Sequence, residues 1–380
     1  MSARGWIGAL VLLLGSVEAR AQRPPETHPT SSHQRIELKF DRSAPPGDVV
    51  LWPERTVLGM QAVDGSGPSY GQINLTCRSS VDATSGRCSA EVLEDRVIGP
   101  APITLEFREQ RSGQRIEVDL TAGIQRIEGS QRCNADYWDP QIFVPWTTGG
   151  TNCFVPPIGT GVQLQLVTNQ VARLVAGRWT ATLILGLRVD ASGGIASSHT
   201  FDFDLTITDR DNVAIYFPSF DQITPLVGLN LAYDPISAPP SIGGRAHLDM
   251  CLYDGLGSQS EYLAVTVREK DPRPAPGRVP GRYSVWHHGG GREPRDRLDF
   301  QIRLDHDGQV VPLPNAEEVR LHGIDRVRLR LVMLPGMSQP VFCVPTPLTL
   351  DTPRVPASEK RDGYYDGELQ VQLRLPTDLP

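Results

Sequence analysis

The feature that most constrains this sequence is its closing apolar segment, residues 369–375. Leu369, Val371 and Leu373 alternate with polar residues, so one face is apolar and the other is polar. A period of two residues is typical of a half-buried β-strand, and no stripe of helical period fits the same positions. A strand that closes a chain must pair with another strand, because an unpaired edge recruits other chains. Alternation alone predicts the last strand of an ordinary β-sandwich.

The first 21 residues have the organisation of a secretory signal peptide. Arg4 supplies the positive charge, residues 7–14 form a short apolar run, and residues 19–21 are Ala-Arg-Ala, directly before Gln22. Such a segment is removed during export and takes no part in the fold. Neither this run nor any later one is long enough to span a bilayer as a helix. We therefore expect a soluble, exported mature chain.

The body of the chain is predicted to be all-β. The sequence contains 36 Gly and 33 Pro, which supply many turns,. Alternating apolar residues predict strands and one hairpin, at residues 35–40, 103–107, 116–120, 179–189 and 200–207. Short helical turns are expected at residues 169–175 and 315–319, each opened by an Asn that can act as an N-cap. No long amphipathic helix is predicted.

A polar run at residues 208–212 predicts a domain boundary, because it separates two apolar segments. Further strands are expected after it, at residues 213–217, 245–252, 261–267, 300–304, 310–313 and 327–333. We therefore expect two β-sandwiches in series. The predicted division is a signal peptide at 1–21, an N-terminal domain at 22–208, a linker at 209–212 and a C-terminal domain at 213–380. Residues 271–297, rich in Pro, Gly and Arg, look like an exposed insert.

Six cysteines in a chain expected to be exported indicate disulfide bonds. The simplest pairing without nesting joins Cys77 to Cys88, Cys133 to Cys153, and Cys251 to Cys343. Six cysteines allow fifteen connectivities, so spacing alone does not select this one. A metal site is not indicated, because no Cys-x-x-Cys pair occurs and no histidine stands at ligand spacing from a cysteine.

Other function classes find little support in the sequence. The net charge of −7 argues against a general surface for nucleic acid,. Ser69 lies in a Gly-x-Ser-x-Gly pattern, but residues 72–76 continue as a strand where a nucleophile elbow needs a helix. Residues 305–308 (Asp-His-Asp-Gly) lack the remaining ligands of a calcium loop and predict a hairpin turn. We therefore predict no enzyme, no cofactor and no metal. A secreted β-sandwich hydrolase with Ser69 as its nucleophile is the alternative.

Several segments carry a resemblance to one family. Residues 245–255, with the run Asp-Met-Cys-Leu-Tyr-Asp, resemble the cysteine strand of the minor tip adhesins of class 5 fimbriae, the CblD-like pilus biogenesis initiators. Residues 205–220, the segment 340–345 around the last cysteine, and the ending 363–367 before the closing strand are similar to the same family. All six cysteines fall where the family has three disulfides, in the pairing given above.

The resemblance implies two immunoglobulin-like domains, an N-terminal adhesin domain and a C-terminal pilin domain that lacks its final strand. A periplasmic chaperone would fill the gap first, and a donor strand of the next subunit, the major pilin, would replace it, with an outer-membrane usher as a further partner. The strands implied to flank the groove contribute Val213, Ile215, Phe217, Leu369, Val371 and Leu373. The implied role is a tip subunit that initiates a fimbria, is exported through the periplasm to the bacterial surface, and binds a host-cell glycan or glycoprotein.

The receptor-binding residues of the family are only partly matched. Family members use arginines on the adhesin domain, one shortly before the first cysteine, where this chain has Gln72. Others follow the strand that here begins at Trp179, where Arg188 is the one residue that could stand in. A solvated charge at the end of a strand is the alternative interpretation of Arg188. The resemblance therefore implies adhesion without identifying the receptor.

Overall fold

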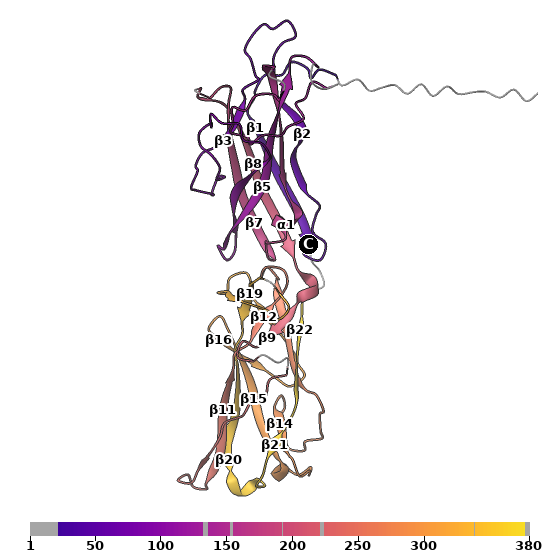
Figure 1. The fold of residues 1–380 in the computed structure, drawn as a ribbon. Coiled ribbons are helices and arrows are strands. Elements are labelled where there is room, and N and C mark those ends of the chain that lie inside the picture. Colours follow the sequence, from indigo (N-terminus) through magenta and orange to yellow (C-terminus); the bar gives the residue numbers. More distant parts are fainter. Residues whose placement is uncertain are drawn as a thin grey trace, which may run out of the picture.

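The computed structural model describes residues 22–131, 136–152, 155–191, 193–220, 224–337 and 339–376. The predicted signal peptide, Cys133 and Cys153 lie outside these ranges. Strands dominate both halves of the chain, and the halves are stacked end to end (Figure 1). No helix in the described ranges is long and apolar enough to cross a membrane. The predicted all-β class with two domains in tandem is confirmed.

The N-terminal domain is built from one eight-stranded sheet. Its strands are β1 (Ser32–Asp41), β2 (Val49–Met60), β3 (Asn74–Cys77), β4 (Ala101–Glu109), β5 (Arg115–Glu128), β6 (Pro157–Leu166), β7 (Gly177–Arg188) and β8 (Ile195–Thr208). They run in the order β1-β8-β7-β4-β5-β6-β2, with β3 on β7. Trp52 of β2 meets His199 and Phe201 of β8 edge-on, with ring centroids 5.0 Å apart. The sheet therefore folds over, so that its two ends face each other across one core.

The C-terminal domain contains shorter strands in three sheets. The strands are β9 (Ala214–Tyr216), β10 (Leu231–Asp234), β11 (Ser241–Leu248), β12 (Cys251–Tyr253), β13 (Tyr262–Glu269), β14 (Tyr283–His287), β15 (Arg297–His306), β16 (Gln309–Leu313), β17 (Glu318–His322), β18 (Arg330–Val332), β19 (Val341–Pro345), β20 (Leu348–Pro356), β21 (Tyr365–Asp366) and β22 (Leu369–Arg374). The sheet orders are β10-β11-β20-β15-β14-β21 with β16 on β15, then β18-β19-β12-β9, and β17-β13-β22. Three short 3-10 helices accompany them: η1 (Arg210–Asn212), η2 (Pro294–Asp296) and η3 (Ala357–Glu359).

Several local predictions are confirmed and two are wrong. β4 and β5 form the predicted hairpin, with Ile103 opposite Leu120, and α1 (Thr168–Val171) supplies the first helical turn. The helical turn expected at 315–319 is wrong, because Val319 pairs with β13 as part of β17. The exposed insert expected at 271–297 is also wrong in its middle. There Tyr283 of β14 is fully buried, and its hydroxyl lies within hydrogen-bond distance of the Val267 and Leu313 carbonyls.

Two disulfide bonds lie within the described residues. Cys77 is bonded to Cys88 at the end of β3, with Cα atoms 5.3 Å apart. Cys251 is bonded to Cys343, which joins β12 to β19 with Cα atoms 5.7 Å apart. These bonds match two of the three predicted pairs, and the third falls on residues outside the described ranges.

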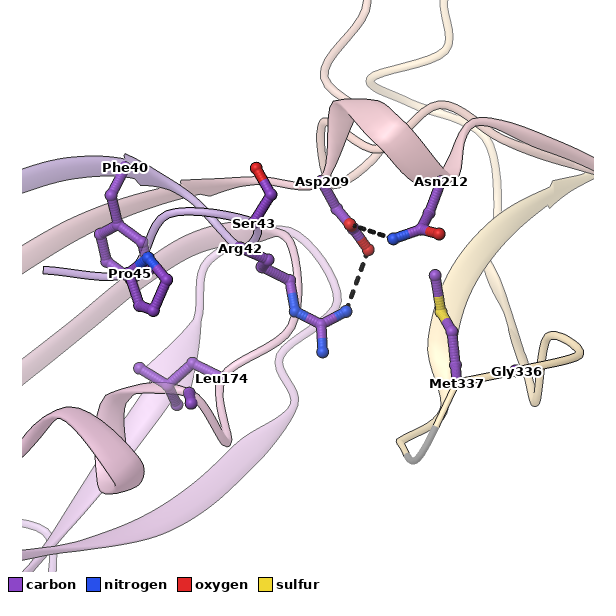
Figure 2. A pocket seen from close by; sticks show the side chains of 10 residues that line it. Phe40, Arg42, Ser43, Pro45, Leu174, Asp209, Asn212, Gly336 and Met337 are labelled. Carbon is purple, nitrogen blue, oxygen red and sulfur yellow. Dashed lines mark hydrogen bonds and ion pairs between the residues drawn. The ribbon is translucent and has the colours of Figure 1, made fainter.

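The two domains meet around Asp209, which directly follows β8. Its buried carboxylate accepts hydrogen bonds from Arg42 Nη1 at 2.9 Å and from the Tyr253 hydroxyl at 3.0 Å. Figure 2 shows Arg42 and Asp209 beside Met337 of the C-terminal domain, at a cavity of about 290 Å³. Backbones also meet here, because a Cβ on Gly257 would lie 2.5 Å from the Cα of Gly177. The junction is therefore closed by direct contact between the domains.

Candidate functional site

The closing strand β22 is a sheet edge whose apolar face is incompletely covered. It pairs antiparallel with β13, with Val371 opposite Val267, and no strand in the described residues pairs with its other edge. Leu369, Val371 and Leu373 are half-buried, whereas the polar residues between them are exposed. Val267 on the partner strand is fully buried. The period of two is therefore as predicted, but the inward face of β22 still reaches solvent.

Residues 224–230, directly before β10, form a second edge without a ladder partner in the described chain. Within the described parts of residues 217–230, the one backbone–backbone hydrogen bond joins Phe220 N to Phe217 O. Residues 224–230 nevertheless alternate between exposed and half-buried, and Val227 and Leu229 pack on the C-terminal core. This burial pattern is that of an extended strand without a ladder partner. Its N–H and C=O groups are available for pairing.

The apolar residues of the two edges pack around one core. β9 and β22 approach each other next to the domain junction (Figure 1). Half-buried apolar residues of both edges surround the same core, namely Ile215, Phe217, Phe220, Val227, Leu229, Leu369, Val371, Leu373 and Leu375. We call these residues the groove. The one charged residue of β22, Arg374, lies on its exposed face and pairs with Glu318 at 2.6 Å.

Five of the six predicted groove residues border this site, and Val213 does not. Val213 directly follows η1 and is half-buried, and in the described chain it does not pack on the C-terminal core. Sequence analysis missed Phe220, Val227 and Leu229. The alternation of Val227 and Leu229 is the signal that could have found two of them, although Pro225 and Gly228 are unfavourable within a strand,.

The groove geometry suits an extended apolar peptide. Unpaired backbone edges on both sides can accept ladder hydrogen bonds, and alternate side chains of an incoming strand can enter the apolar floor between them. Within the described residues, no group of three or more His, Cys, Asp or Glu is placed to hold a metal. The residues around this core are all apolar, so the arrangement offers a binding surface.

Arg188 is engaged within its own domain. Its Nη1 donates to the Gly193 carbonyl at 2.7 Å, and its Nε lies 3.4 Å from the Thr76 hydroxyl. The guanidinium thus holds the β7–β8 loop against β3. Arg188 is therefore a half-buried, hydrogen-bonded residue rather than a solvated charge, and these contacts leave only part of the guanidinium for a ligand.

Ser69 lacks the surroundings of a nucleophile. It is exposed in the loop before β3, and the residues that follow it form a turn and then that strand rather than a helix. In the described chain no histidine is hydrogen-bonded to Ser69, whereas a serine nucleophile needs a base within about 3.2 Å. Its neighbour Tyr70 instead bonds His28 at 2.7 Å, which ties down the start of the described chain.

Comparison with known proteins gives consistent matches over both domains. The family model of the first domain of CfaE, a component of the CFA/I fimbria, matches residues 17–210, and that of its second domain matches residues 213–377. The CfaE protein of the CFA/I fimbria of Escherichia coli is 25% identical over 326 residues, which is 82% of each chain.

Solved structures share the tandem fold. The crystal structure of CfaE, the adhesive subunit of the CFA/I fimbria of enterotoxigenic Escherichia coli, superposes with a TM-score of 0.67 at 19% identity, covering 94% of this chain and 95% of that one. A chaperone–tip adhesin complex of CFA/I fimbriae biogenesis gives a TM-score of 0.65 at 19% identity, over 94% and 99% of the two chains.

Proposed function

This chain belongs to the CfaE family of CFA/I fimbrial proteins, as an adhesin-type tip subunit of a fimbria, and we propose that its groove is filled by a β-strand from another chain. The observation that carries the proposal is the pair of unpaired edges, β22 and residues 224–230, around one half-covered core. An added strand would complete both ladders and bury the half-exposed Val371 and Leu373. The unfilled groove would otherwise be an exposed, aggregation-prone edge.

A periplasmic chaperone is the first partner that the family supports, because a tip adhesin of this fold forms a chaperone complex. We propose that the chaperone fills the groove during export, that an outer-membrane usher receives the complex, and that the major pilin then inserts its own strand. The mature protein would stand at the fimbrial tip on the bacterial surface. Residues 1–21 would act as the signal peptide, residues 22–208 as the adhesin domain, 209–212 as the linker and 213–380 as the pilin domain.

The start of the described chain supports a terminal position in the fibre. Thr27 and Met60 exchange two backbone hydrogen bonds, of 3.0 and 2.8 Å. All ten residues of β1 are in register with β8. A segment held in this way is not free to fill a groove elsewhere, so residues 27–41 would not act as a donor strand. The adhesin domain is then free to bind a host-cell glycan or glycoprotein, with Arg188 as the one candidate residue that the family suggests.

The experiment that tests the groove compares two neighbouring substitutions on β22. Val371→Asp places a charge among apolar groove residues, where desolvation without a partner costs several kcal/mol. We expect it to abolish chaperone binding and fibre initiation. Gln372→Asp, one position along on the exposed face, should leave both largely intact, because period-two alternation turns its side chain to water. Co-purification with the chaperone measures the difference.

A fused donor strand provides the complementary gain of function. An alternating apolar strand joined after the last residue by a flexible linker should yield a soluble monomer that no longer binds the chaperone. Equal loss of chaperone binding in both β22 variants, or no rescue by the fused strand, would mean that β22 is an ordinary sandwich edge.

A further inference from the structure

Three apolar side chains form a stripe across strands β10, β11 and β20. Tyr233 stands directly opposite Ile242, which stands opposite Val355, so the three share one face of the sheet,. Tyr233 is 60% exposed, and the other two are half-exposed. In the described chain, none of the three packs on either hydrophobic core. This apolar surface is thus not explained by the packing of the domain itself.

Two further exposed apolar residues lie close to the stripe along the chain. Leu231, two residues before Tyr233 on β10, is 43% exposed, and Ile236, in the turn after β10, is 92% exposed. We call Leu231, Tyr233, Ile236, Ile242 and Val355 the base patch. An ion pair of Arg354 with Asp234, 3.6 Å apart, joins the sequence neighbours of Val355 and Tyr233, whose side chains point to the opposite face,. An exposed apolar patch with an aromatic anchor is typical of a protein interface.

The base patch lies at the end of the C-terminal domain that points away from the junction. β11 and β12 run from Ser241 at this end to Tyr253, whose hydroxyl meets Asp209 at the junction. β22 is antiparallel to β13, with Leu369 opposite Glu269 at the start of β22 and Arg374 opposite Ala264 near its end. β22 also runs toward the junction. Figure 1 shows β11 and β20 reaching this free end.

The patch is continuous with one wall of the groove. Val227 and Leu229 belong to the groove, and β10 begins only two residues after Leu229. At its other end the groove adjoins the N-terminal domain, because Ala214 and Tyr216 of β9 pack on the core shared across the junction. A strand that is attached to a folded domain must therefore leave the groove at the free end. Its folded domain then arrives next to the base patch.

We propose that the base patch docks the folded domain of the subunit whose strand fills the groove. The proposal rests on the proposed function of the groove and adds a second contact, between folded domains, to the strand exchange. The contact would fix the orientation of the tip subunit on the fibre, since a strand on a flexible linker leaves that orientation free. Tyr233 and Ile236 are the anchors, because they are the most exposed residues of the base patch.

The test expresses the full chain together with the chaperone, usher and other subunits of its own fimbria. Tyr233→Ser and Ile236→Ser, singly and combined, are compared with Val310→Ser on β16, an apolar residue with 64% exposure outside the patch. All of these side chains are exposed, so the variants should fold. We expect the combined variant to form the chaperone complex normally but to appear in isolated fimbriae about tenfold less often, as for loss of interface anchors. The Val310→Ser control should be incorporated into fimbriae as often as the unchanged chain.

Each other outcome has a distinct meaning. Normal incorporation of the combined variant would overturn the proposal while leaving the groove intact, provided that Val371→Asp is still excluded from the complex. Loss of chaperone binding by the patch variants would assign the patch to the chaperone and overturn the docking of the next subunit. Concentration-dependent dimers of the strand-fused chain, abolished by Tyr233→Ser, would assign it to a second copy. Normal incorporation of the Val371→Asp variant into fimbriae would instead contradict the proposed function of the groove.

Discussion

The junction between the domains depends on one buried carboxylate, and its removal gives a measurable prediction. Asp209 is 2% exposed and Tyr253 is 1% exposed, so the hydrogen bond between them is shielded from water. Asp209→Ala leaves the Tyr253 hydroxyl without a partner, which costs about 1–3 kcal/mol. Arg42 also loses its ion pair, but its side chain is 20% exposed and can recover some hydration. We therefore expect a total loss of about 3 kcal/mol, at the lower end of what breaking a fully buried pair costs.

A double-mutant cycle isolates the hydrogen bond across the junction. Tyr253→Phe should cost about 1 kcal/mol, and the combined variant should cost less than the sum of the two, by about 1 kcal/mol, because both changes remove the same bond. Urea unfolding of the strand-fused chain gives the free energies, and proteolysis of the 209–213 connection reports separation of the domains. The matched control is Glu117→Gln, which breaks an exposed ion pair with Arg87 at 2.7 Å. It should change little, because water screens both charges.

Either of two results would contradict this role of Asp209. If the effects of Asp209→Ala and Tyr253→Phe simply add, the hydrogen bond between them contributes nothing. If Asp209→Ala is as mild as the Glu117 control, the burial of the carboxylate is unimportant for stability.

Three further predictions concern stability. Cys251→Ser should cost about 4.5 kcal/mol and Cys88→Ser about 3 kcal/mol in urea unfolding, because the bonds that they break close loops with sequence separations of 92 and 11,. Burial raises the pKa of Asp41, but hydrogen bonds from neighbouring hydroxyls and backbone N–H groups outweigh it and hold the pKa below its ordinary value. The contribution of Asp41 to the free energy of unfolding should be lost as the pH falls below about 4. Asp41→Asn should make the free energy of unfolding less dependent on pH in that range. Burial, with the charge of Asp139, raises the pKa of Glu128, whose carboxylate oxygens have no hydrogen-bond partner in the described chain. Glu128→Gln should therefore retain or increase stability at neutral pH, and should remove a gain in stability on acidification.

Short-range patterns in the sequence were sufficient for most of the fold. The alternation at residues 103–107 and 116–120 fixes the faces of β4 and β5, because a strand needs only a period of two and a turn between its partners. The helical turn expected at 315–319 failed for the opposite reason. Asn315 can cap a helix, but Val319 gains more by pairing opposite Val265 in the core sheet, and tertiary context overrides such weak local preferences.

Buried polar residues were beyond the reach of the sequence. Arg126 lies on β5 with no exposed surface, and it donates to several neutral acceptors, including the Ile73 carbonyl at 2.7 Å and the Thr160 hydroxyl at 2.8 Å. Burial lowers the pKa of Arg126 to about 9. From the sequence alone, an arginine within a strand is expected to face solvent, because the long-range contacts of its guanidinium are not visible there. Only the folded chain brings these acceptors together.

The closing strand shows where inference from a pattern ends. Residues 369–375 would alternate in the same way whether the second edge of β22 were paired or open. The period of the side chains depends on which face is buried and not on whether the backbone groups are hydrogen-bonded. The distinguishing feature lies more than a hundred residues earlier, in residues 224–230, which alternate as a strand but lack a ladder in this chain. Two such edges around one core require a strand from outside the chain if both are to be paired. The strongest argument for strand exchange is therefore the coincidence of these two incomplete edges, and neither edge would be sufficient alone.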